Sequence, residues 1–426
     1  MDFQKTLQYM MSRLPMYQKV GGSAFKKGLD NIKHLCEALG NPQDLYDTIH
    51  IAGTNGKGSA THYLAAIFQT SGYKTGLYTS PHLKSFTERI KINGHEIPEQ
   101  SVVNFIENNK NLIESLSPSF FEITVAMAFQ HFAEAKVDIA IIETGLGGRL
   151  DSTNILQRPL VSLITNISHD HMGMLGDTLP EIAAEKAGII KGNVPVVISE
   201  KQEEVAAIFI EKAKEKNAPI FFAEDAISVL GENKLEVKKE GEVWMENLQS
   251  GLFGKHQHKN ITGVLKTIDL INTKTLKYAI SDESILLGIQ QVVALTGLKG
   301  RWQQLNEKPF VFCDILHNEA GVEILLQQLA HYTYQQLYMV WGMVTDKQHD
   351  KILKMLPQSA YYIFCKPNVP RGLDAQELQE KAKKFGLVGE VLENVNEAYQ
   401  KALSLANTDD FIFVGGSTFV VAEMPI

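Results

Sequence analysis

The sequence has few cysteines, no long apolar run and no apolar signal segment. Its three cysteines, Cys36, Cys313 and Cys365, are far apart and lack the spacing of metal-binding pairs. This argues against a disulfide framework and fits a reducing compartment. No stretch approaches the roughly 18 apolar residues that suggest a membrane span, and the N-terminal residues include an early acid. We therefore predict a cytoplasmic protein with no membrane partner.

The chain also lacks an excess of basic charge. It has 41 Lys and Arg against 49 Asp and Glu, a net charge of −8, which gives no general attraction to nucleic acid. Apolar residues at 44% and charged residues at 21% are ordinary for a globular protein, so disorder and collagen-like structure are excluded. With 426 residues, and about 150 residues per domain, we expect two or three domains.

Short apolar runs alternate with helical patterns through the first two thirds of the chain. Residues 1–45 carry a helical pattern that Gly40-Asn41-Pro42 ends. Candidate buried strands follow at residues 48–52, 138–142, 160–165 and 194–198, with helical patterns such as 59–71 and 122–135 between them. This alternation predicts a doubly wound, mainly parallel sheet. Residues 226–245 change to short alternating runs, which predicts a small β excursion.

A second α/β pattern begins near Thr296-Gly297-Leu298-Lys299-Gly300 and continues to Gly415-Gly416-Ser417. Its length is that of an ordinary domain. We predict an α/β protein of two domains: residues 1–296, with a P-loop and a mainly parallel sheet, and residues 297–426, a Rossmann-like α/β domain. A cleft between two such domains is a usual ligand site.

The clearest motif is Gly53-Thr54-Asn55-Gly56-Lys57-Gly58-Ser59, which follows a candidate strand and precedes a helix expected to open at Ala60. Glycines let backbone N–H groups turn toward phosphate oxygens, Lys57 supplies a cation and Ser59 a hydroxyl. The loop is two residues shorter than the usual phosphate-loop pattern. The competing interpretation is a glycine-rich turn that only caps a helix.

Glu143 stands at the end of the second candidate strand, directly before Thr144-Gly145-Leu146-Gly147-Gly148-Arg149. Ligands of parallel sheets lie beyond the carboxyl ends of the strands, so we expect Glu143 to share an edge with the phosphate loop. An acid there suits Mg²⁺, which prefers oxygen ligands. Taken alone, such an acid is more often a helix cap or a salt-bridge partner.

A third polar segment, Thr165 to His171, also follows a candidate strand. His169 and His171 lack a further Cys or His at zinc spacing, so a polar loop that satisfies local backbone groups is an equal interpretation. Asp170-His171-Met172-Gly173 matches the D-x-x-G of GTPases, but no Asn-Lys-x-Asp follows. Lys186 lies in a helical pattern, where a lysine normally faces solvent.

Taken in order, the motifs resemble the folylpolyglutamate synthase/dihydrofolate synthase family of the Mur ligase superfamily. The likeness covers roughly residues 25 to 420. Its N-terminal motifs are Gly53–Ser59, 78–83, 88–90, 121–122, 143–154, 169–176 and 185–188. Its C-terminal motifs are 256–260, 300–303, 314–318, 342–347 and 370–372.

The resemblance implies an ATP-dependent acid–amino-acid ligase of folate biosynthesis and one-carbon metabolism. A carboxylate attacks the γ-phosphate of ATP, and L-glutamate then attacks the acyl phosphate to give an amide, ADP and phosphate. Phosphoryl transfer depends on positioning and charge neutralisation, which suits the residues found. Residues 1–296 correspond to the Mur ligase central-type ATP-binding domain and residues 297–426 to the glutamate-ligase domain. The acceptor is dihydropteroate, a folate or both, and we expect a bifunctional enzyme.

The resemblance also implies roles for individual residues. Lys57, His171 and Lys186 are the expected catalytic residues. The expected ATP-binding residues are Asn55, Gly56, Lys57, Gly58, Ser59, Asn260, Arg301 and Asp314. The expected pterin- or glutamate-binding residues are Phe121, Glu122 and His317. The expected metal ligands at two Mg²⁺ sites are Ser80, Glu143, His171 and Lys186, the last as a carbamate.

Without the family, Arg301 is better explained by a surface salt bridge, Asp314 by a strand-end cap, and Phe121-Glu122 by the start of an amphipathic helix. The chain departs from the family pattern at Glu319, where proline is usual, and at Gln348, where aspartate is usual. Another Mur-type ligase and a P-loop ATPase switch module stay open as alternatives. We expect a monomer, and a monovalent cation requirement is open.

Overall fold

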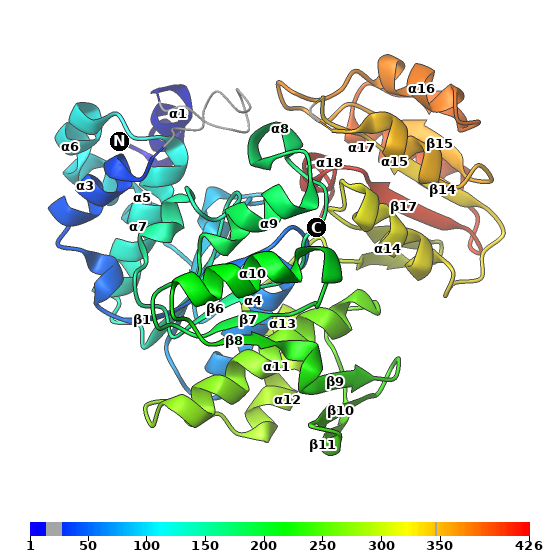
Figure 1. The fold of residues 1–426 in the computed structure, drawn as a ribbon. Helices are drawn as coiled ribbons and strands as arrows, with labels where there is room; N and C mark the ends of the chain where they lie inside the picture. The colour runs from blue at the N-terminus through cyan, green and yellow to red at the C-terminus, as the bar shows by residue number, and fades with distance from the viewer. Residues whose placement is uncertain (14–27, 346) are drawn as a thin grey trace. The chain divides into compact units, whose positions relative to one another are not determined.

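Two large sheets, the first before residue 223 and the second after residue 302, carry the fold (Figure 1). The computed structural model describes residues 1–13, 28–345 and 347–426. Contacts divide the chain into two units, Met1–Gly297 and Leu298–Ile426. The helical pattern at the N-terminus becomes α1 (Phe3–Arg13) and α3 (Asp30–Ala38). Its part over residues 14–27 lies outside the described residues, as does Asp346.

The N-terminal unit contains an eight-stranded sheet in the order β4-β3-β2-β5-β1-β6-β7-β8. All neighbours from β2 to β8 are parallel, and β3 and β4 form an antiparallel edge. The central strands are continuous buried apolar runs, as expected for a sheet covered on both faces. The strands are β1 (Asp47–Ala52), β2 (Thr75–Tyr78), β3 (Ile90–Ile92), β4 (His95–Glu96), β5 (Ile139–Glu143), β6 (Val161–Ile164), β7 (Val196–Ile198) and β8 (Ile220–Phe222). The predicted mainly parallel sheet is confirmed.

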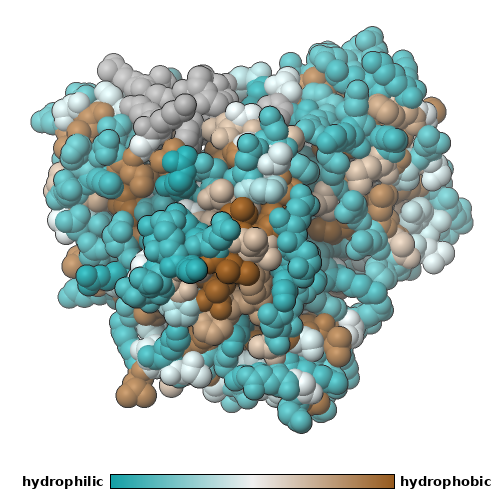
Figure 2. Space-filling model, in the orientation of Figure 1, coloured by the Kyte–Doolittle hydropathy of each residue, from teal (hydrophilic) through white to brown (hydrophobic). Residues whose placement is uncertain are grey.

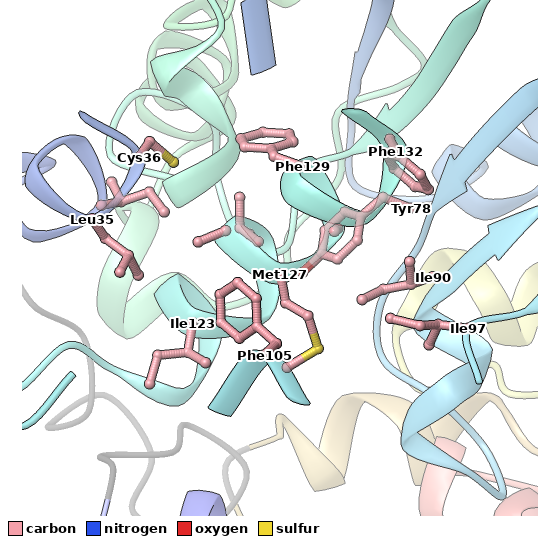
Figure 3. Close-up of a cluster of buried hydrophobic side chains, with 14 of the residues drawn as sticks. Leu35, Cys36, Tyr78, Ile90, Ile97, Phe105, Ile123, Met127, Phe129 and Phe132 are labelled. Atoms are coloured by element: carbon pink, nitrogen blue, oxygen red, sulfur yellow. The ribbon is translucent and has the colours of Figure 1, made fainter. Parts of the chain in front are cut away.

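Helices cover both faces of this sheet. On one face α7 (Phe120–Glu134) contributes to the core drawn in Figure 3, where Phe129, Phe132 and Met127 pack near Tyr78 and Ile90. Further along that face lie α9 (Leu179–Ala187) and α10 (Glu203–Glu215). The opposite face carries α4 (Lys57–Thr70) and α11 (His256–Lys274). The remaining helices are α5 (Glu99–Asn108), α6 (Lys110–Leu116), α8 (Met172–Leu175), α12 (Asp282–Gln290) and α13 (Val292–Thr296).

The predicted β excursion is confirmed as a separate three-stranded antiparallel sheet in the order β11-β10-β9. Its strands are β9 (Ile227–Leu230), β10 (Leu235–Lys239) and β11 (Glu242–Leu248). In β9, buried and exposed residues alternate, the pattern of a sheet with one wet face. The buried side contacts α11.

The C-terminal unit contains a six-stranded mixed sheet in the order β12-β13-β17-β14-β15-β16. β12 is antiparallel to β13 and the other pairs are parallel. The strands are β12 (Gln303–Glu307), β13 (Phe310–Cys313), β14 (Leu337–Trp341), β15 (Tyr361–Phe364), β16 (Val388–Val391) and β17 (Phe411–Gly415). The helices are α14 (Glu319–Leu329), α15 (His349–Met355), α16 (Ala375–Lys383), α17 (Val395–Leu405) and α18 (Thr418–Ala422). The predicted Rossmann-like α/β arrangement is confirmed.

The surface agrees with the ordinary composition. The face drawn in Figure 2 is mostly hydrophilic, with hydrophobic residues in small groups. Among the described residues, no helix combines the length and the apolar character needed to pass through a membrane.

Candidate active site

The phosphate-loop motif occupies the turn between β1 and α4. Gly53 has φ +152° and Gly56 has φ +84°, in the region that favours glycine. A Cβ at Gly53 would lie 1.8 Å from Thr165 Oγ1, and one at Gly56 would lie 2.2 Å from Asn260 Oδ1. Both positions therefore require glycine. The helix begins at Lys57 rather than at the expected Ala60, which places Lys57 and the following residues in its first turn.

The loop after β6 braces the phosphate loop. Thr54 N donates to Asn166 O at 2.8 Å, and Asn55 N donates to Asn166 Oδ1 at 2.9 Å. Thr165 Oγ1 donates to Asn55 O at 2.6 Å, and Ser168 N donates to Thr54 Oγ1 at 3.1 Å. The segment is thus a polar loop, but the expectation that it satisfies local backbone groups is wrong for residues 165–168. The groups that it satisfies belong to the phosphate loop, 110 residues earlier in the chain.

Two lysines converge on one carbonyl of the phosphate loop. Lys57 Nζ donates to Gly53 O at 2.9 Å and to Thr54 O at 3.1 Å. Lys186 Nζ, from α9, donates to the same Gly53 O at 2.9 Å. Burial and the nearby charge of Lys57 lower the pKa of Lys186 to about 7. Its side chain is only 3% exposed, so the expectation that a helical lysine faces solvent is wrong here.

The segment 147–149 holds the turn of α9 that carries Lys186. A Cβ at Gly148 would lie 2.8 Å from Glu185 O, and one at Gly188 would lie 2.3 Å from Arg149 Cα. Arg149 N donates to Glu185 O at 2.8 Å, and Arg149 Nη2 pairs with Glu185 Oε1 at 2.7 Å. The two backbones therefore approach closely, which fixes the direction of Lys186.

Glu143 and Ser80 meet at the same edge of the sheet. Ile51 of β1 is in register with Glu143 of β5, and Tyr78 of β2 with Ile142. Ser80 N donates to Glu143 Oε2 at 3.3 Å, and Glu143 is 4% exposed. The carboxyl ends of β1, β2 and β5 thus bring the phosphate loop, Glu143 and Ser80 to one edge. The shared edge of Glu143 and the phosphate loop was predicted from the behaviour of parallel sheets.

His171 occupies the N-cap position of the short helix α8 with a φ of +50°, and its side chain makes no capping hydrogen bond there. Its Nε2 lies 3.7 Å from Asp170 Oδ2. Among the residues that the structure describes, no group of three or more His, Cys, Asp or Glu side chains forms a metal cage. Mg²⁺ is usually held by one or two carboxylates together with substrate phosphates and water. The oxygen donors of Ser80 and Glu143 beside the phosphate loop fit such a site.

Phe121 and Glu122 lie at the start of α7. A Cβ at Gly145 would lie 2.3 Å from Phe121 Cζ, so the Phe121 ring covers the turn that follows Glu143. Ser119 N donates to Glu122 Oε2 at 2.6 Å, and Glu122 N donates to Ser119 Oγ at 3.2 Å, which forms a capping box. The expected start of a helix with an N-terminal acid is therefore observed.

Asn260 lies in the first turns of α11, packed on the phosphate loop. Asn260 Nδ2 donates to Gln257 Oε1 at 2.9 Å, and Gln257 Nε2 donates to Ser59 Oγ at 3.4 Å. Gln257 is 2% exposed. Our sequence reasoning did not assign a role to Gln257, although it belongs to the motif 256–260 that includes Asn260.

Arg301, Asp314 and His317 group together in the C-terminal unit at the carboxyl end of β13. Asp314 accepts hydrogen bonds from Trp302 N at 2.7 Å and Leu316 N at 3.1 Å, which makes it a strand-end cap. Burial raises the pKa of Asp314, and the charge of Arg301 opposes that shift. Nδ1 of His317 donates to Ile315 O at 3.0 Å.

Comparisons with known proteins agree with this geometry. Residues 51–268 match the Mur ligase middle domain, and residues 300–418 match the Mur ligase, glutamate ligase domain. The chain is 33% identical over 413 residues to the dihydrofolate synthase/folylpolyglutamate synthase of Bacillus subtilis, covering 94% of each chain.

Two solved structures extend the comparison. Escherichia coli FolC in complex with DHPP and ADP is 28% identical with a TM-score of 0.88, over 99% of this chain and 96% of that one. A bifunctional folylpolyglutamate synthase/dihydrofolate synthase with Mn, AMPPNP and L-glutamate bound is 29% identical with a TM-score of 0.86, over 99% and 97%. The chain belongs to the dihydrofolate synthase/folylpolyglutamate synthase family of ATP-dependent Mur-type amide ligases.

Proposed function

We propose that the chain joins L-glutamate to the carboxylate of dihydropteroate and of folates, as a bifunctional dihydrofolate synthase/folylpolyglutamate synthase. The observation that carries the proposal is the pair of amine nitrogens, from Lys57 and Lys186, that donate to the Gly53 carbonyl. This pair lies at the N-terminus of α4, where a phosphate group is stabilised by backbone N–H groups and the helix dipole. Two of the relatives that match over nearly the whole chain carry both activities in their names.

The reaction has two balanced steps. A carboxylate oxygen of the pterin substrate attacks the γ-phosphorus of ATP, the bond to the β-phosphate oxygen breaks, and ADP leaves with an acyl phosphate formed. The amino group of glutamate then attacks the acyl carbon, inorganic phosphate leaves, and the nitrogen loses a proton. The products are an amide, ADP and phosphate. In both steps an anionic substrate approaches an anionic phosphate group. The protein must therefore supply positive charge and exclude water.

ATP binding is assigned to the phosphate loop, with Asn55, Gly56, Gly58 and Ser59 around the phosphates and Lys57 neutralising the γ-phosphate. Asn260 joins this group because it packs directly on Gly56. Arg301 and Asp314 are assigned to ATP from the C-terminal unit.

Metal binding is assigned to Ser80, Glu143, His171 and Lys186, at two Mg²⁺ sites. When bound, Mg²⁺ would neutralise phosphate charge during transfer. Glu143 and Ser80 would hold one ion from the edge of the sheet, and His171 the other. The lowered pKa of Lys186 leaves much of its amine uncharged at neutral pH. An uncharged amine can add to CO₂, releasing a proton and giving a carbamate with carboxylate-like oxygens.

Substrate binding is assigned to Phe121 and Glu122 for the pterin and to His317 for glutamate. The half-buried Phe121 ring would stack by one of its faces on a flat pterin. Because Glu122 caps α7, its contribution would be to fix Phe121 rather than to touch the substrate itself. We further propose a cytoplasmic monomer whose partners are small molecules, with any monovalent cation a secondary requirement.

The test is an assay of ADP release with ATP, Mg²⁺ and L-glutamate, with dihydropteroate and tetrahydrofolate offered separately and the products weighed by mass spectrometry. We expect each acceptor to gain one glutamyl unit, with one ADP formed per amide. Product from only one acceptor would show a single activity. Neither ADP release nor product with either acceptor would indicate another Mur-type ligase, and ADP release without any amide would indicate a P-loop ATPase switch.

A further inference from the structure

The motif Glu88-Arg89-Ile90 has no role in the site described so far. It ends the 3₁₀ turn Phe86–Arg89, which follows the loop that carries Ser80. The loop begins after β2 and returns to the sheet at β3, so it connects two neighbouring strands. Because Ser80 is assigned to a metal, whatever fixes this loop fixes a ligand.

Glu88 holds the second half of the loop by its backbone. Its carboxylate accepts hydrogen bonds from Leu83 N at 2.7 Å, Lys84 N at 2.9 Å and Ser85 N at 3.1 Å. Three consecutive N–H groups turned to one carboxylate form a nest, in which a charged acceptor gives stronger bonds than a neutral one. Ser85 and Glu88 also complete a capping box. A carboxamide at position 88 would replace one of the two acceptor oxygens with a donor.

Arg89 holds the first half of the loop. Its backbone oxygen accepts a bond from Thr79 N at 3.0 Å, and its Nε donates to His82 Nδ1 at 2.7 Å. The guanidinium lies over the Phe120 ring at 5.6 Å from the centroid. Arg89 is 4% exposed, and burying a charge is costly unless the protein compensates it. A loop that needed only packing would be served better by an apolar side chain.

The bond between Arg89 and His82 also settles which nitrogen of His82 carries the proton. Arg Nε–H can only donate, so Nδ1 of His82 accepts, and in the neutral ring the proton lies on Nε2. Neither ring nitrogen then offers a lone pair to a metal ion. His82 is therefore a strut that joins the loop to Arg89, and it is not itself a candidate metal ligand.

We propose that Glu88 and Arg89 are positioning residues that hold the Ser80 loop against Glu143: Glu88 through three backbone N–H groups and Arg89 through His82 and Thr79. The inference rests on the proposed function, because it needs Ser80 and Glu143 to bind a divalent cation. The proposal adds Glu88, Arg89 and the strut His82 to the residues on which cation affinity depends. None of the three is expected to touch the ion.

The test measures Mn²⁺ affinity by electron paramagnetic resonance, with AMPPNP present, for Glu88→Gln and Arg89→Lys. Partners that orient metal ligands typically contribute 10- to 100-fold in affinity, so we expect a loss of about tenfold or more in each variant. Asp374→Asn is the matched control, because Asp374 also accepts two backbone N–H bonds, from Gln376 and Glu377, but in the C-terminal unit. Its Mn²⁺ affinity should equal that of the unsubstituted chain.

A pair of substitutions at His82 separates positioning from folding. In His82→Asn the amide Oδ1 stands where Nδ1 stood and can accept from Arg89, so Mn²⁺ affinity should be retained. In His82→Phe the acceptor is gone, and affinity should fall as in Arg89→Lys. This pair of variants still tests the positioning role of Arg89 if Glu88→Gln does not fold.

Thermal unfolding of every variant is recorded beside the Mn²⁺ titration. Lower melting temperatures with unchanged Mn²⁺ affinity would overturn the proposal, since they would show a purely structural role. Equal loss in His82→Asn and His82→Phe would overturn the part assigned to Arg89. Absence of Mn²⁺ binding by the unsubstituted chain would overturn the metal assignment of Ser80 and Glu143, and the proposal with it.

Discussion

The two units of the chain use their interiors in different ways. The N-terminal unit buries ionisable side chains at the carboxyl edge of its sheet: Glu143 and Arg89 are 4% exposed and Lys186 is 3% exposed. Among the Asp, Glu, Lys and Arg residues of the described part of the C-terminal unit, the one that is fully buried is Asp410, which accepts backbone bonds from Gln336 and Asn407. The Asp410 carboxylate therefore stabilises local backbone structure.

The core of the C-terminal unit is an aromatic stack. Trp302 lies 5.0 Å from Phe312 and 5.8 Å from Phe413, centroid to centroid, and Phe312 lies 5.3 Å from Phe411 at an interplanar angle of 9°. Such contacts gain dispersion and burial energy without desolvating a charge. The buried charges of the N-terminal unit cost stability, so their presence there points to chemistry. The comparison predicts that substitutions at that edge reduce activity, and that substitutions in the stack reduce stability.

The largest effect is expected for Lys57→Ala in the N-terminal unit. Removing this cation removes charge stabilisation at the γ-phosphate, so turnover should fall by roughly 10³-fold or more, with little change in unfolding free energy. ADP release and amide formation are measured together. Lys212→Ala is the control, because Lys212 pairs with Glu215 on the surface of α10. Near-normal turnover of Lys57→Ala would remove the phosphate-loop assignment.

The second test addresses the aromatic stack. Phe312 is 1% exposed, and replacing a buried Phe by Ala typically costs about 3–5 kcal/mol. We expect Phe312→Ala to lower the unfolding free energy of the C-terminal unit by that amount, as measured in urea. Val388→Ala, at a side chain that is 66% exposed, should change it little. A similar loss in both variants would show that the stack is not the main source of stability there.

The third test concerns Lys186. If its carbamate is a metal ligand, Lys186→Ala should lower turnover by about 10- to 100-fold, and added acetate should restore part of it by supplying a carboxylate. Lys191→Ala is the matched control, since Lys191 lies just beyond α9 and donates to Asn154 O at 2.9 Å. It should show neither the loss nor the rescue. Unchanged turnover in Lys186→Ala would make Lys186 a structural residue only.

The sequence predicted the central part of the fold and the separate motifs better than the contacts between them. β1, β5 and β6 were predicted to within one residue at each end, because they are short, mainly apolar runs. β12 (Gln303–Glu307) and β16 (Val388–Val391) were not predicted, because polar or glycine-containing edge strands lack that pattern. The phosphate loop was predicted because its residue types must occur in a fixed local order.

Contacts between distant segments had no such local signal. Nothing in the spacing of Gln257 indicates its bond to Ser59, and nothing in Asn166 indicates that it braces Asn55. The burial of Lys186 likewise depends on the close approach of Gly148 to α9, a property of the folded chain. The family resemblance supplied Lys186 as a candidate, whereas the structure supplied the reason for its lowered pKa.

The smallest expected effect is a pH dependence confined to the N-terminal unit. His50 of β1 is fully buried, with Nε2 2.8 Å from Thr153 Oγ1, and burial lowers its pKa to about 3. An unfolded histidine titrates near pH 6.5, so below that pH the unfolded state binds more protons. The contribution of neutral His50 to the unfolding free energy is therefore complete above about pH 6.5. It declines by at most about 1.4 kcal/mol per pH unit as the pH falls toward 3. Replacing His50 by Gln, which keeps a polar group near the Nε2 position, should therefore flatten the decline in unfolding free energy between pH 7 and 5 by about 2 kcal/mol. His331→Gln, at an exposed position of the C-terminal unit, should keep the original slope, and equal slopes in all three proteins would show that His50 does not set the acid sensitivity of this sheet.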